Sequence, residues 1–208
     1  MNEQATQAQT AEKSKKQLDP RVAYYLRIVG TLFVITTIVS VLLALVNMVT
    51  KPIIDELAEQ KRLAALSEVM PDAQYEAVAD LPVGVDGLVA MTHATRDGNS
   101  AGYCVQVTTN GFGGAIEMMV GVDENGAITG ITFLSMSETA GVGSKAKSEP
   151  WFTEQYLDRS GQIAVSKVQA DATHIQAISG ATVTSNAVTK GVNNALLAVD
   201  AYQKGGIS

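Results

Sequence analysis

An uncharged run near the N-terminus dominates the hydropathy pattern. Residues 28–49, IVGTLFVITTIVSVLLALVNMV, contain no charged side chain. A helix of about 20 apolar residues crosses a hydrocarbon core of about 30 Å, so the run predicts a transmembrane helix. A cleaved signal peptide is the alternative interpretation, but its apolar region spans only about 7–15 residues before a small-residue cleavage site. This run is longer and ends in LVNMVTKP, which favours a retained single-pass anchor.

Charged residues on either side of the run predict its orientation. Basic side chains are more frequent before it (Lys13, Lys15, Lys16, Arg21, Arg27) than closely after it (Lys51, Lys61, Arg62). Because positive flanks tend to remain in the cytoplasm, we expect residues 1–27 to be a polar cytoplasmic N-terminus. The part of the chain after the anchor is then expected on the extracytoplasmic side of the cell membrane.

After Lys51-Pro52, apolar residues recur near helical spacing, which predicts an amphipathic stalk helix over residues 50–71 that ends at Pro71. The apolar positions are Ile54, Leu57, Ala58, Leu63, Leu66 and Val69. Residues 72–86 are rich in Pro, Gly and Asp and predict a loop. We therefore expect the remaining domain to comprise residues 72–208.

A block with short-range alternation and turn signals follows. The segments 87–95 and 101–109 flank RDGNS, and the segments 113–123 and 127–136 flank ENG. Asp97-Gly98 and Asn125-Gly126 are dipeptides typical of tight hairpin turns. The pattern predicts an antiparallel sheet of at least four strands.

The C-terminal third predicts short strands between helices. SEPWFTEQYLDRSG (148–161) indicates a helix that ends at Gly161, with Trp151, Phe152, Tyr156 and Leu157 on its buried side. QIAVSKV (162–168) and ATHIQAI (172–178) are strand candidates. A last helix is expected from about Ser185 to Tyr202, with an apolar stripe of Val188, Val192, Ala195, Leu196 and Val199. Strands followed by helices favour an α+β class.

Composition excludes several classes of function. The net charge of −6 argues against a nucleic-acid partner, which would require basic patches. Cys104 is the single cysteine, so it forms no internal disulfide and reads as a small buried strand residue. His93 and His174 are the two histidines, and both read as partly exposed strand or loop residues. Neither HExxH nor GxxxxGK[ST] occurs, which argues against a self-contained hydrolase.

Three segments rich in glycine or hydroxyl groups remain, at 108–123, 137–145 and 179–185. Taken singly, each reads as an ordinary turn or helix start. The third nevertheless places Ser179, Thr182, Thr184 and Ser185 around the start of a helix, where free N–H groups and the helix dipole favour an anion. Thr184 and Ser185 are also expected as helix caps.

Together and in this order behind one membrane helix, GFGGAIEMMVGVDENGAITGI, SETAGVGSK and SGATVTSNAV resemble the G subunit of the Rnf electron-transport complex. That family is related to the C subunit of the sodium-pumping NADH:quinone reductase. The resemblance extends from the anchor to the C-terminus. It implies an electron-carrying subunit, without a complete active site of its own, in a membrane-bound ferredoxin:NAD oxidoreductase that pumps Na⁺ or H⁺. Its partners would be the other membrane and peripheral subunits.

The resemblance also implies FMN attached covalently through a phosphoester to Thr182, which directly follows Gly180-Ala181. Thr184 is the rival acceptor. A separate flavin transferase, using FAD and a divalent metal, is expected to install the group. In the family, the loop matching ETAGVG packs against the flavin ring, and a lysine on the short strand before the acceptor lies near it. The implied cofactor-binding residues are Ser179, Gly180, Ala181, Thr182, Thr184, Ser185, Glu138, Thr139, Val142, Gly143 and Lys167, with no metal ligands.

Two positions depart from the family pattern. Many members have an acidic residue where this chain has Gln176, and a proline where it has Ala140. Lys167 could also be an ordinary exposed charge. Two other functions stay open at this point. One is an extracytoplasmic flavin reductase module that donates electrons to a soluble acceptor and would need a proton donor beside the flavin. The other is a cofactor-free scaffold.

Overall fold

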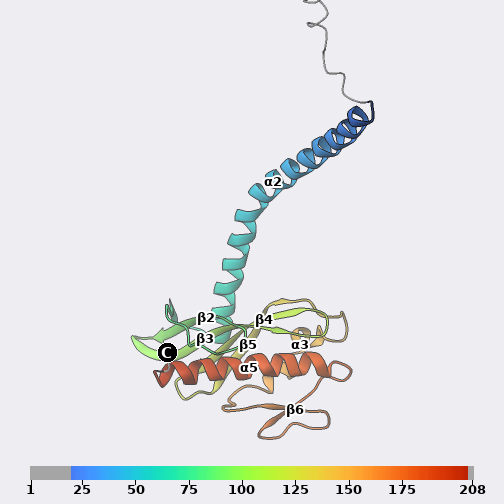
Figure 1. Cartoon of the computed structure of the whole chain (residues 1–208). Helices are drawn as coiled ribbons and strands as arrows, with labels where there is room; N and C mark the ends of the chain where they lie inside the picture. Colours follow the sequence, from blue (N-terminus) through green and yellow to red (C-terminus); the bar gives the residue numbers. More distant parts are fainter. Residues whose placement is uncertain (1–19, 206–208) are drawn as a thin grey trace, which may run out of the picture. The chain divides into compact units, whose positions relative to one another are not determined.

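The computed structural model describes residues 20–205, so most of the predicted cytoplasmic segment 1–27 lies outside the described residues. The chain divides into two compact units at the boundary between Glu56 and Leu57. In order, the elements are α2 (Pro20–Val69), β1 (Gln74–Ala77), β2 (Leu88–Arg96), β3 (Asn99–Asn110), β4 (Ala115–Asp123), β5 (Ile128–Met136), α3 (Lys145–Ser148), α4 (Pro150–Glu154), β6 (Ala164–Ser166), β7 (His174–Gln176) and α5 (Thr182–Gln203), as labelled in part in Figure 1.

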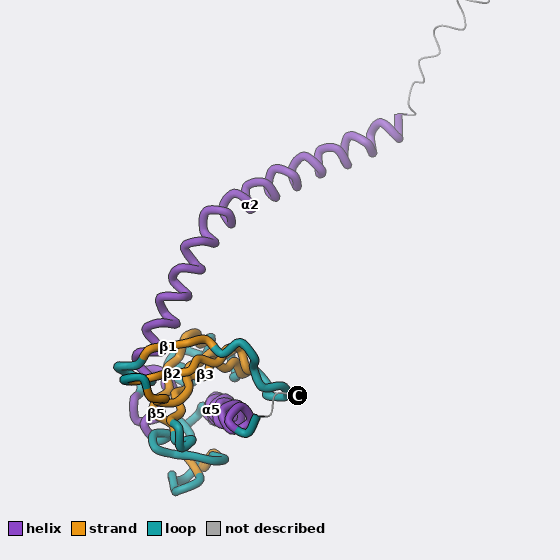
Figure 2. Tube along the Cα trace, turned by 90° about the vertical axis from the view of Figure 1, so that its left-hand side faces the viewer, coloured by secondary structure: helices purple, strands orange, loops and turns teal. Residues whose placement is uncertain are grey.

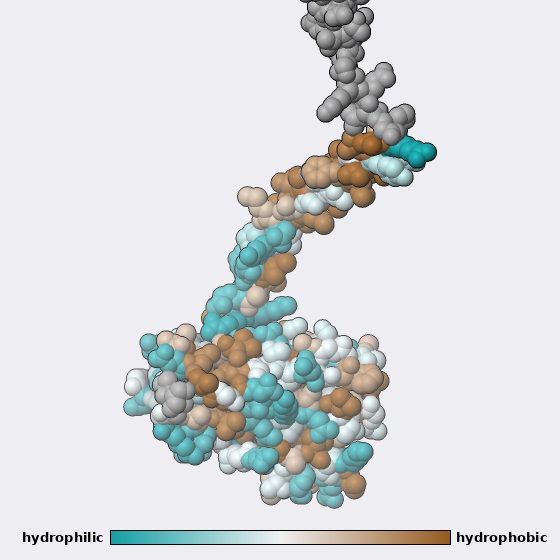
Figure 3. All heavy atoms as spheres, viewed as in Figure 1, coloured by the Kyte–Doolittle hydropathy of each residue, from teal (hydrophilic) through white to brown (hydrophobic). Residues whose placement is uncertain are grey.

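The described part of the first unit is α2 from Pro20 to Glu56, which includes the apolar part of this helix. Every residue from 28 to 49 is exposed, and this segment forms the apolar surface of the helix in Figure 3. At 1.5 Å per residue it is about 33 Å long. By length and composition, α2 is the one helix within residues 20–205 that could cross a membrane. Thr31 and Thr37 donate their hydroxyls to carbonyls one turn earlier, so these polar groups are satisfied without water.

The predicted anchor and stalk are parts of one continuous helix. Pro52 lies inside α2, which ends at Val69, just before Pro71. The expected apolar stripe is buried only at its end, at Leu66 and Val69, whereas Ile54, Leu57 and Leu63 are exposed. The hydropathy pattern therefore located the helix but overestimated how much of its apolar face is covered.

The second unit is built on a five-stranded antiparallel sheet in the order β1-β2-β3-β4-β5. Both predicted hairpin turns are present, at Asp97-Gly98 between β2 and β3 and at Asn125-Gly126 between β4 and β5. The expectation of a loop over residues 72–86 is wrong at β1, which pairs with β2. Four residues among turn-forming neighbours carry too little periodicity to mark this edge strand.

The two faces of the sheet are covered by different helices. Val105 on β3 and Met118 on β4 belong to the larger core, which α5 shares. Their neighbours Cys104 and Met119 belong to a second core with Leu66 and the end of α2. Figure 2 views α5 nearly end-on beside the strands. Because successive side chains of a strand point to opposite faces, coverage of both faces explains why β3 and β4 contain adjacent buried residues.

Around this sheet, the other predictions are confirmed in part. The strand candidates 162–168 and 172–178 contain β6 and β7, which pair in parallel. The single helix expected over 148–161 is wrong: α3 and α4 are separate short helices. Phe152 and Tyr156 are fully buried, but Trp151 and Leu157 remain 40% and 41% exposed. Because α4 ends at Glu154, Tyr156 and Leu157 lie beyond it and do not continue the helical stripe that the sequence pattern predicted.

Candidate functional site

Glu138 joins two of the three glycine-rich or hydroxyl-rich segments. Its carboxylate oxygen Oε1 accepts a hydrogen bond from the Phe112 N–H (2.8 Å), and Oε2 accepts one from the Gly113 N–H (3.1 Å). This single side chain therefore fixes the backbone of the loop between β3 and β4 against the loop that follows β5.

Gly143 brings the third segment to the same place. A Cβ atom at this position would lie 2.6 Å from Glu138 Oε2 and 2.8 Å from Thr184 Oγ1. These distances are too short for real carbon contacts, so a side chain at this position would have to displace Glu138 or Thr184, and glycine lets the loop approach the start of α5 without such a shift. The segments 111–114, 137–144 and 179–185 thus converge on one site.

Helix α5 begins with free main-chain donors. Its N-cap is Ala181, which provides no side-chain hydrogen bond. The first N–H with an acceptor after the cap is that of Ser185, which bonds to the Ala181 carbonyl. Within residues 20–205, the N–H groups of Thr182, Val183 and Thr184 have no hydrogen-bond acceptor. Such N–H groups, together with the helix dipole, suit a phosphate.

The helix starts three residues earlier than expected, at Thr182 rather than Ser185. Thr184 and Ser185 therefore lie inside the first turn, and the prediction that they cap the helix is wrong. The reason is the turn before the helix, where the Ala181 N–H bonds to the Ile178 carbonyl. Gly180 has a φ of 77° in this turn, a conformation that glycine adopts without the strain of other residues.

The hydroxyl groups of this segment differ in accessibility. Thr184 and Ser185 are buried, and Ser185 Oγ accepts from the Ile178 N–H and donates to the Ala181 carbonyl, both at 3.0 Å. Ser179 is exposed and Thr182 is half-buried. Among these four residues, only Ser179 and Thr182 therefore keep appreciable solvent exposure, and Thr182 is the one on the helix.

The ETAGVG loop forms a compact turn without a proline. The Thr139 carbonyl accepts from the N–H groups of Val142 and Ser144, each at 3.2 Å. Ser144 Oγ accepts from the Gly141 N–H at 2.9 Å. These bonds constrain the loop by other means than the fixed φ angle of proline. Val142 remains 39% exposed.

Lys167 lies in the bend that follows β6, whereas the sequence pattern places it on a strand. The lysine is exposed. Its position is still close to the acceptor segment, because the Ala177 N–H bonds to the carbonyl of Ser166, the preceding residue, at 2.8 Å. The strand pattern QIAVSKV was too short to locate its end.

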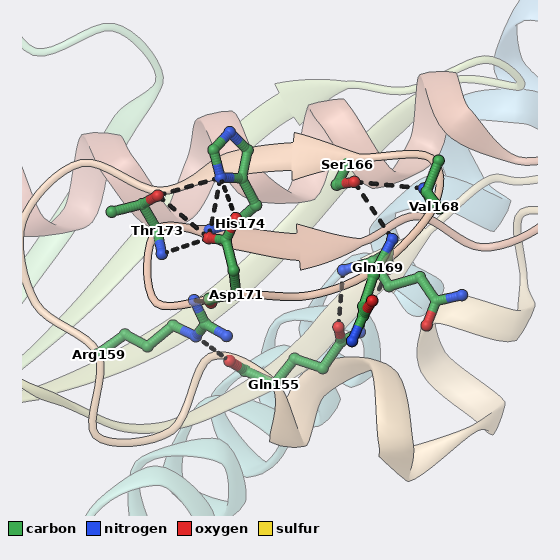
Figure 4. Close-up of polar contacts among 9 residues, drawn as sticks. Gln155, Arg159, Ser166, Val168, Gln169, Asp171, Thr173 and His174 are labelled. Carbon is green, nitrogen blue, oxygen red and sulfur yellow. Dashed lines mark hydrogen bonds and ion pairs between the residues drawn. The ribbon is translucent and has the colours of Figure 1, made fainter.

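The small sheet that leads to the site is held by side-chain amides and a carboxylate (Figure 4). Gln155 Oε1 accepts from the Gln176 N–H (2.7 Å), and Gln155 Nε2 donates to the Gln176 carbonyl (3.2 Å). Gln176 thus has a fixed backbone and an exposed side chain.

Asp171 organises the turn between β6 and β7 (Figure 4). Its Oδ1 accepts from the N–H groups of Thr173 and His174, each at 2.8 Å, and contacts His174 Nδ1 at 2.9 Å. The hydrogen bond from the Thr173 N–H, followed by the His174 side chain, holds the pKa of Asp171 well below its ordinary range. The His174 side chain thus contacts Asp171 within the turn.

The remaining candidates for chemistry have ordinary structural roles. His93 is partly exposed, and its Nε2 lies 2.9 Å from Ser100 Oγ. Cys104 is fully buried as expected, and burial raises the pKa of its thiol to about 12, which keeps it protonated and unreactive. Within residues 20–205, no group of three His, Cys, Asp or Glu side chains could hold a metal ion.

Two exposed apolar residues at the site were missed by the sequence patterns. Phe112 is 75% exposed in the β3–β4 loop, and Val183 is 53% exposed in the first turn of α5. The available signal was a lone aromatic residue in the glycine run GFGG. This signal is ambiguous, because an aromatic side chain in a loop reads equally well as a core anchor.

Comparisons with known proteins agree on one family. The family model of the FMN-binding domain matches residues 111–197, a range that contains all three converging segments. The G subunit of the Na⁺-translocating ferredoxin:NAD⁺ oxidoreductase complex of Acetobacterium woodii is 34% identical over 207 residues, with 92% of this chain and 97% of that protein covered.

Two further similarities are informative. The G subunit of the proton-translocating ferredoxin:NAD⁺ oxidoreductase complex of Clostridium ljungdahlii is 32% identical over 173 residues, covering 82% of this chain and 90% of that protein. The crystal structure of Shewanella oneidensis NqrC has a TM-score of 0.50 at 15% identity, covering 60% of this chain and 72% of that chain. The latter similarity shows a shared fold.

Proposed function

We propose that this chain, which belongs to the family of G subunits of ion-translocating ferredoxin:NAD⁺ oxidoreductase (Rnf) complexes, relays electrons through FMN joined to Thr182 by a phosphoester bond. It is an electron-transfer subunit of an ion-translocating oxidoreductase with an FMN-binding domain. The observation that carries the covalent assignment is the start of α5, where the half-buried Thr182 is the first of three residues whose N–H groups have no acceptor within the described chain.

The residues present fit the phosphate end of FMN. Gly180 provides the turn that exposes the helix start, and the N–H groups of Thr182, Val183 and Thr184 can donate to phosphate oxygens. The dipole of α5, a helix of 22 residues, favours the negative charge there. When bound, the flavin supplies one- and two-electron chemistry, while the protein fixes its position.

Accessibility favours Thr182 over its rival. A separate flavin transferase would use FAD and a divalent metal: the Thr182 hydroxyl oxygen bonds to the FMN phosphorus, AMP leaves, and the hydroxyl proton is released. Such an enzyme must reach the oxygen atom. Thr184 is 1% exposed, whereas Thr182 is half-buried, so modification of Thr184 would require the first turn of α5 to open.

The anchor and its flanks support the proposed location. With its N-terminus in the cytoplasm, as the basic residues indicate, α2 would cross the cell membrane once and place the FMN-binding domain on the extracytoplasmic side. There the domain would contact other membrane and peripheral subunits of a complex that translocates Na⁺ or H⁺. The chain has no complete active site of its own in this proposal.

The test is flavin fluorescence of the denatured protein on a gel, after coexpression with a flavin transferase. Wild type and Thr182→Ser are expected to fluoresce because both keep the acceptor oxygen. Thr182→Ala is expected to be dark. Ser179→Ala and Thr184→Val serve as controls for the neighbouring hydroxyls and should keep the signal. Fluorescence in Thr182→Ala would refute the assignment, and a dark wild type would refute covalent attachment altogether.

A further inference from the structure

We propose that the Phe112 side chain packs against the flavin ring of the FMN bound at Thr182, and so acts as a positioning residue for the cofactor. The inference rests on the proposed function. It starts from Phe112 itself, whose side chain is 75% exposed although its N–H is hydrogen-bonded to Glu138. The backbone is thus fixed, while residues 20–205 leave three quarters of the Phe112 surface exposed.

The construction of the loop isolates this ring. A Cβ at Gly111 would overlap Glu138 Oε1, and one at Gly113 would lie 2.6 Å from the Ser137 carbonyl oxygen. A side chain at position 111 would displace Glu138, and one at position 113 would meet the backbone of Ser137. Phe112 is the one bulky side chain of the segment 111–114. Single exposed apolar residues on a protein surface need no explanation. An aromatic ring on a hydrogen-bonded loop beside a proposed cofactor site, in contrast, calls for one.

Two other exposed apolar residues belong to the same site as Phe112. Val142 and Val183 are 39% and 53% exposed. Val142 precedes Gly143, which meets Glu138, and Val183 precedes Thr184, which lies against Gly143. All three apolar residues thus belong to backbone segments joined through Glu138 and Gly143. Their exposed surface is best covered by a flat and largely apolar partner.

The flavin ring is favoured as that partner because it would be tethered. A phosphoester at Thr182 fixes the ribityl phosphate at the residue next to Val183, so the ring remains at high effective concentration near these side chains. Aromatic rings also associate through offset stacking or edge contacts. Another protein would have to displace the covalently tethered flavin ring before it could cover Phe112, Val142 and Val183.

The experiment uses Phe112→Trp in the full-length, flavin-loaded chain. An indole quenches flavin fluorescence on contact by electron transfer, whereas a phenyl ring does not. We expect the fluorescence lifetime of the native protein to fall several-fold relative to wild type, and the signal to recover fully on denaturation. Leu197→Trp is the matched control: Leu197 is also exposed, but it lies about 22 Å further along α5 than Thr182, and its lifetime should equal that of wild type.

A second variant keeps the test independent of quenching by indole. Phe112→Ala should increase the quenching of the native flavin by iodide, because the ring loses cover. The proposal is overturned if the lifetimes of Phe112→Trp and Leu197→Trp agree, or if Phe112→Ala leaves the iodide quenching unchanged. Gel fluorescence of each denatured variant reports loading, so a dark wild type would instead refute the proposed function.

Discussion

Glycines in the hairpin turns and glycines at the candidate site are required for different reasons. Gly98 and Gly126 have φ angles of 80° and 79°, and a Cβ on either would meet nothing within 4 Å. Gly143 is not among the residues with positive φ, but a Cβ there would collide with Glu138 and Thr184. The turn glycines are needed because of the local backbone conformation. The site glycine is needed because side chains from other segments lie close to it.

The glycines where the end of α2 contacts the sheet resemble Gly143, because another segment lies close to them. Gly121 and Gly130 are opposite each other on β4 and β5, and Val69 packs against both. Thr129 Oγ1 donates to the Val69 carbonyl at 2.7 Å and fixes this contact. Gly121 and Gly130 therefore let the end of α2 approach the sheet backbone, as Gly143 lets Thr184 approach the loop after β5.

The largest effect on stability is expected from Gly121→Ala. Its Cβ would overlap Thr129 Oγ1 and lie 2.7 Å from the Val69 carbonyl oxygen. Because a backbone carbonyl cannot rotate away, overpacking should destabilise the domain by about 1–3 kcal/mol. Chemical denaturation of the full chain in detergent measures this. An unfolding midpoint equal to that of wild type would show that the contact is looser than described.

Gly143→Ala should be milder for stability and more severe for the cofactor. The nearest atom, Glu138 Oε2, can rotate away, whereas Thr184 Oγ1 and Glu138 Cβ would lie 2.8 and 3.0 Å from the added Cβ, so the cost should be about 1 kcal/mol. Rotation of Glu138 would release the Phe112 and Gly113 N–H groups, and covalent flavin on the denaturing gel should fall several-fold. In a double-mutant cycle with Glu138→Ala, the losses of stability should be less than additive; strict additivity would contradict this coupling.

Gly126→Ala should affect stability alone. A side chain at its φ of 79° is strained by about 1 kcal/mol, but Gly126 lies in open space outside the site. The melting temperature should drop while covalent flavin stays at the wild-type level. Gly126→Asn is the control, since Asn tolerates this conformation better and should lose less. Reduced flavin loading in Gly126→Ala would contradict the distinction between glycines of the hairpin turns and glycines of the candidate site.

The smallest effect concerns Asp171, a locally determined turn residue. Its pKa in the folded chain is lowered from the ordinary 3.8, so its contribution is fully present above about pH 4 and is lost as the pH falls further. Protection of the Thr173 and His174 amide protons, measured as their exchange rate relative to the intrinsic rate at the same pH, should therefore decrease in acid in wild type. Asp171→Asn should remove this pH dependence. The global melting temperature should change little, because the carboxylate is exposed.

Local patterns predicted much of the molecule. The uncharged run indicated the apolar helix, Asp-Gly and Asn-Gly dipeptides placed two hairpins, and short β-rich runs contained β6 and β7. The order of three motifs indicated a resemblance to a known family, and that resemblance implied Thr182 as the acceptor, which stays a prediction. These features depend on residues close in the sequence, where helix period, strand alternation and turn conformation act directly.

Only the tertiary structure decided which of these residues meet. Glu138 accepts hydrogen bonds from the N–H groups of Phe112 and Gly113 across separations of 26 and 25 residues. The absence of a side chain at Gly143 leaves room for Thr184. The start of α5 at Thr182 and the burial of Thr184, which separates the two candidate hydroxyls, follow from packing around the Ile178–Ala181 turn. Hydroxyl groups look alike in a sequence, and packing determines which of them a second enzyme can reach.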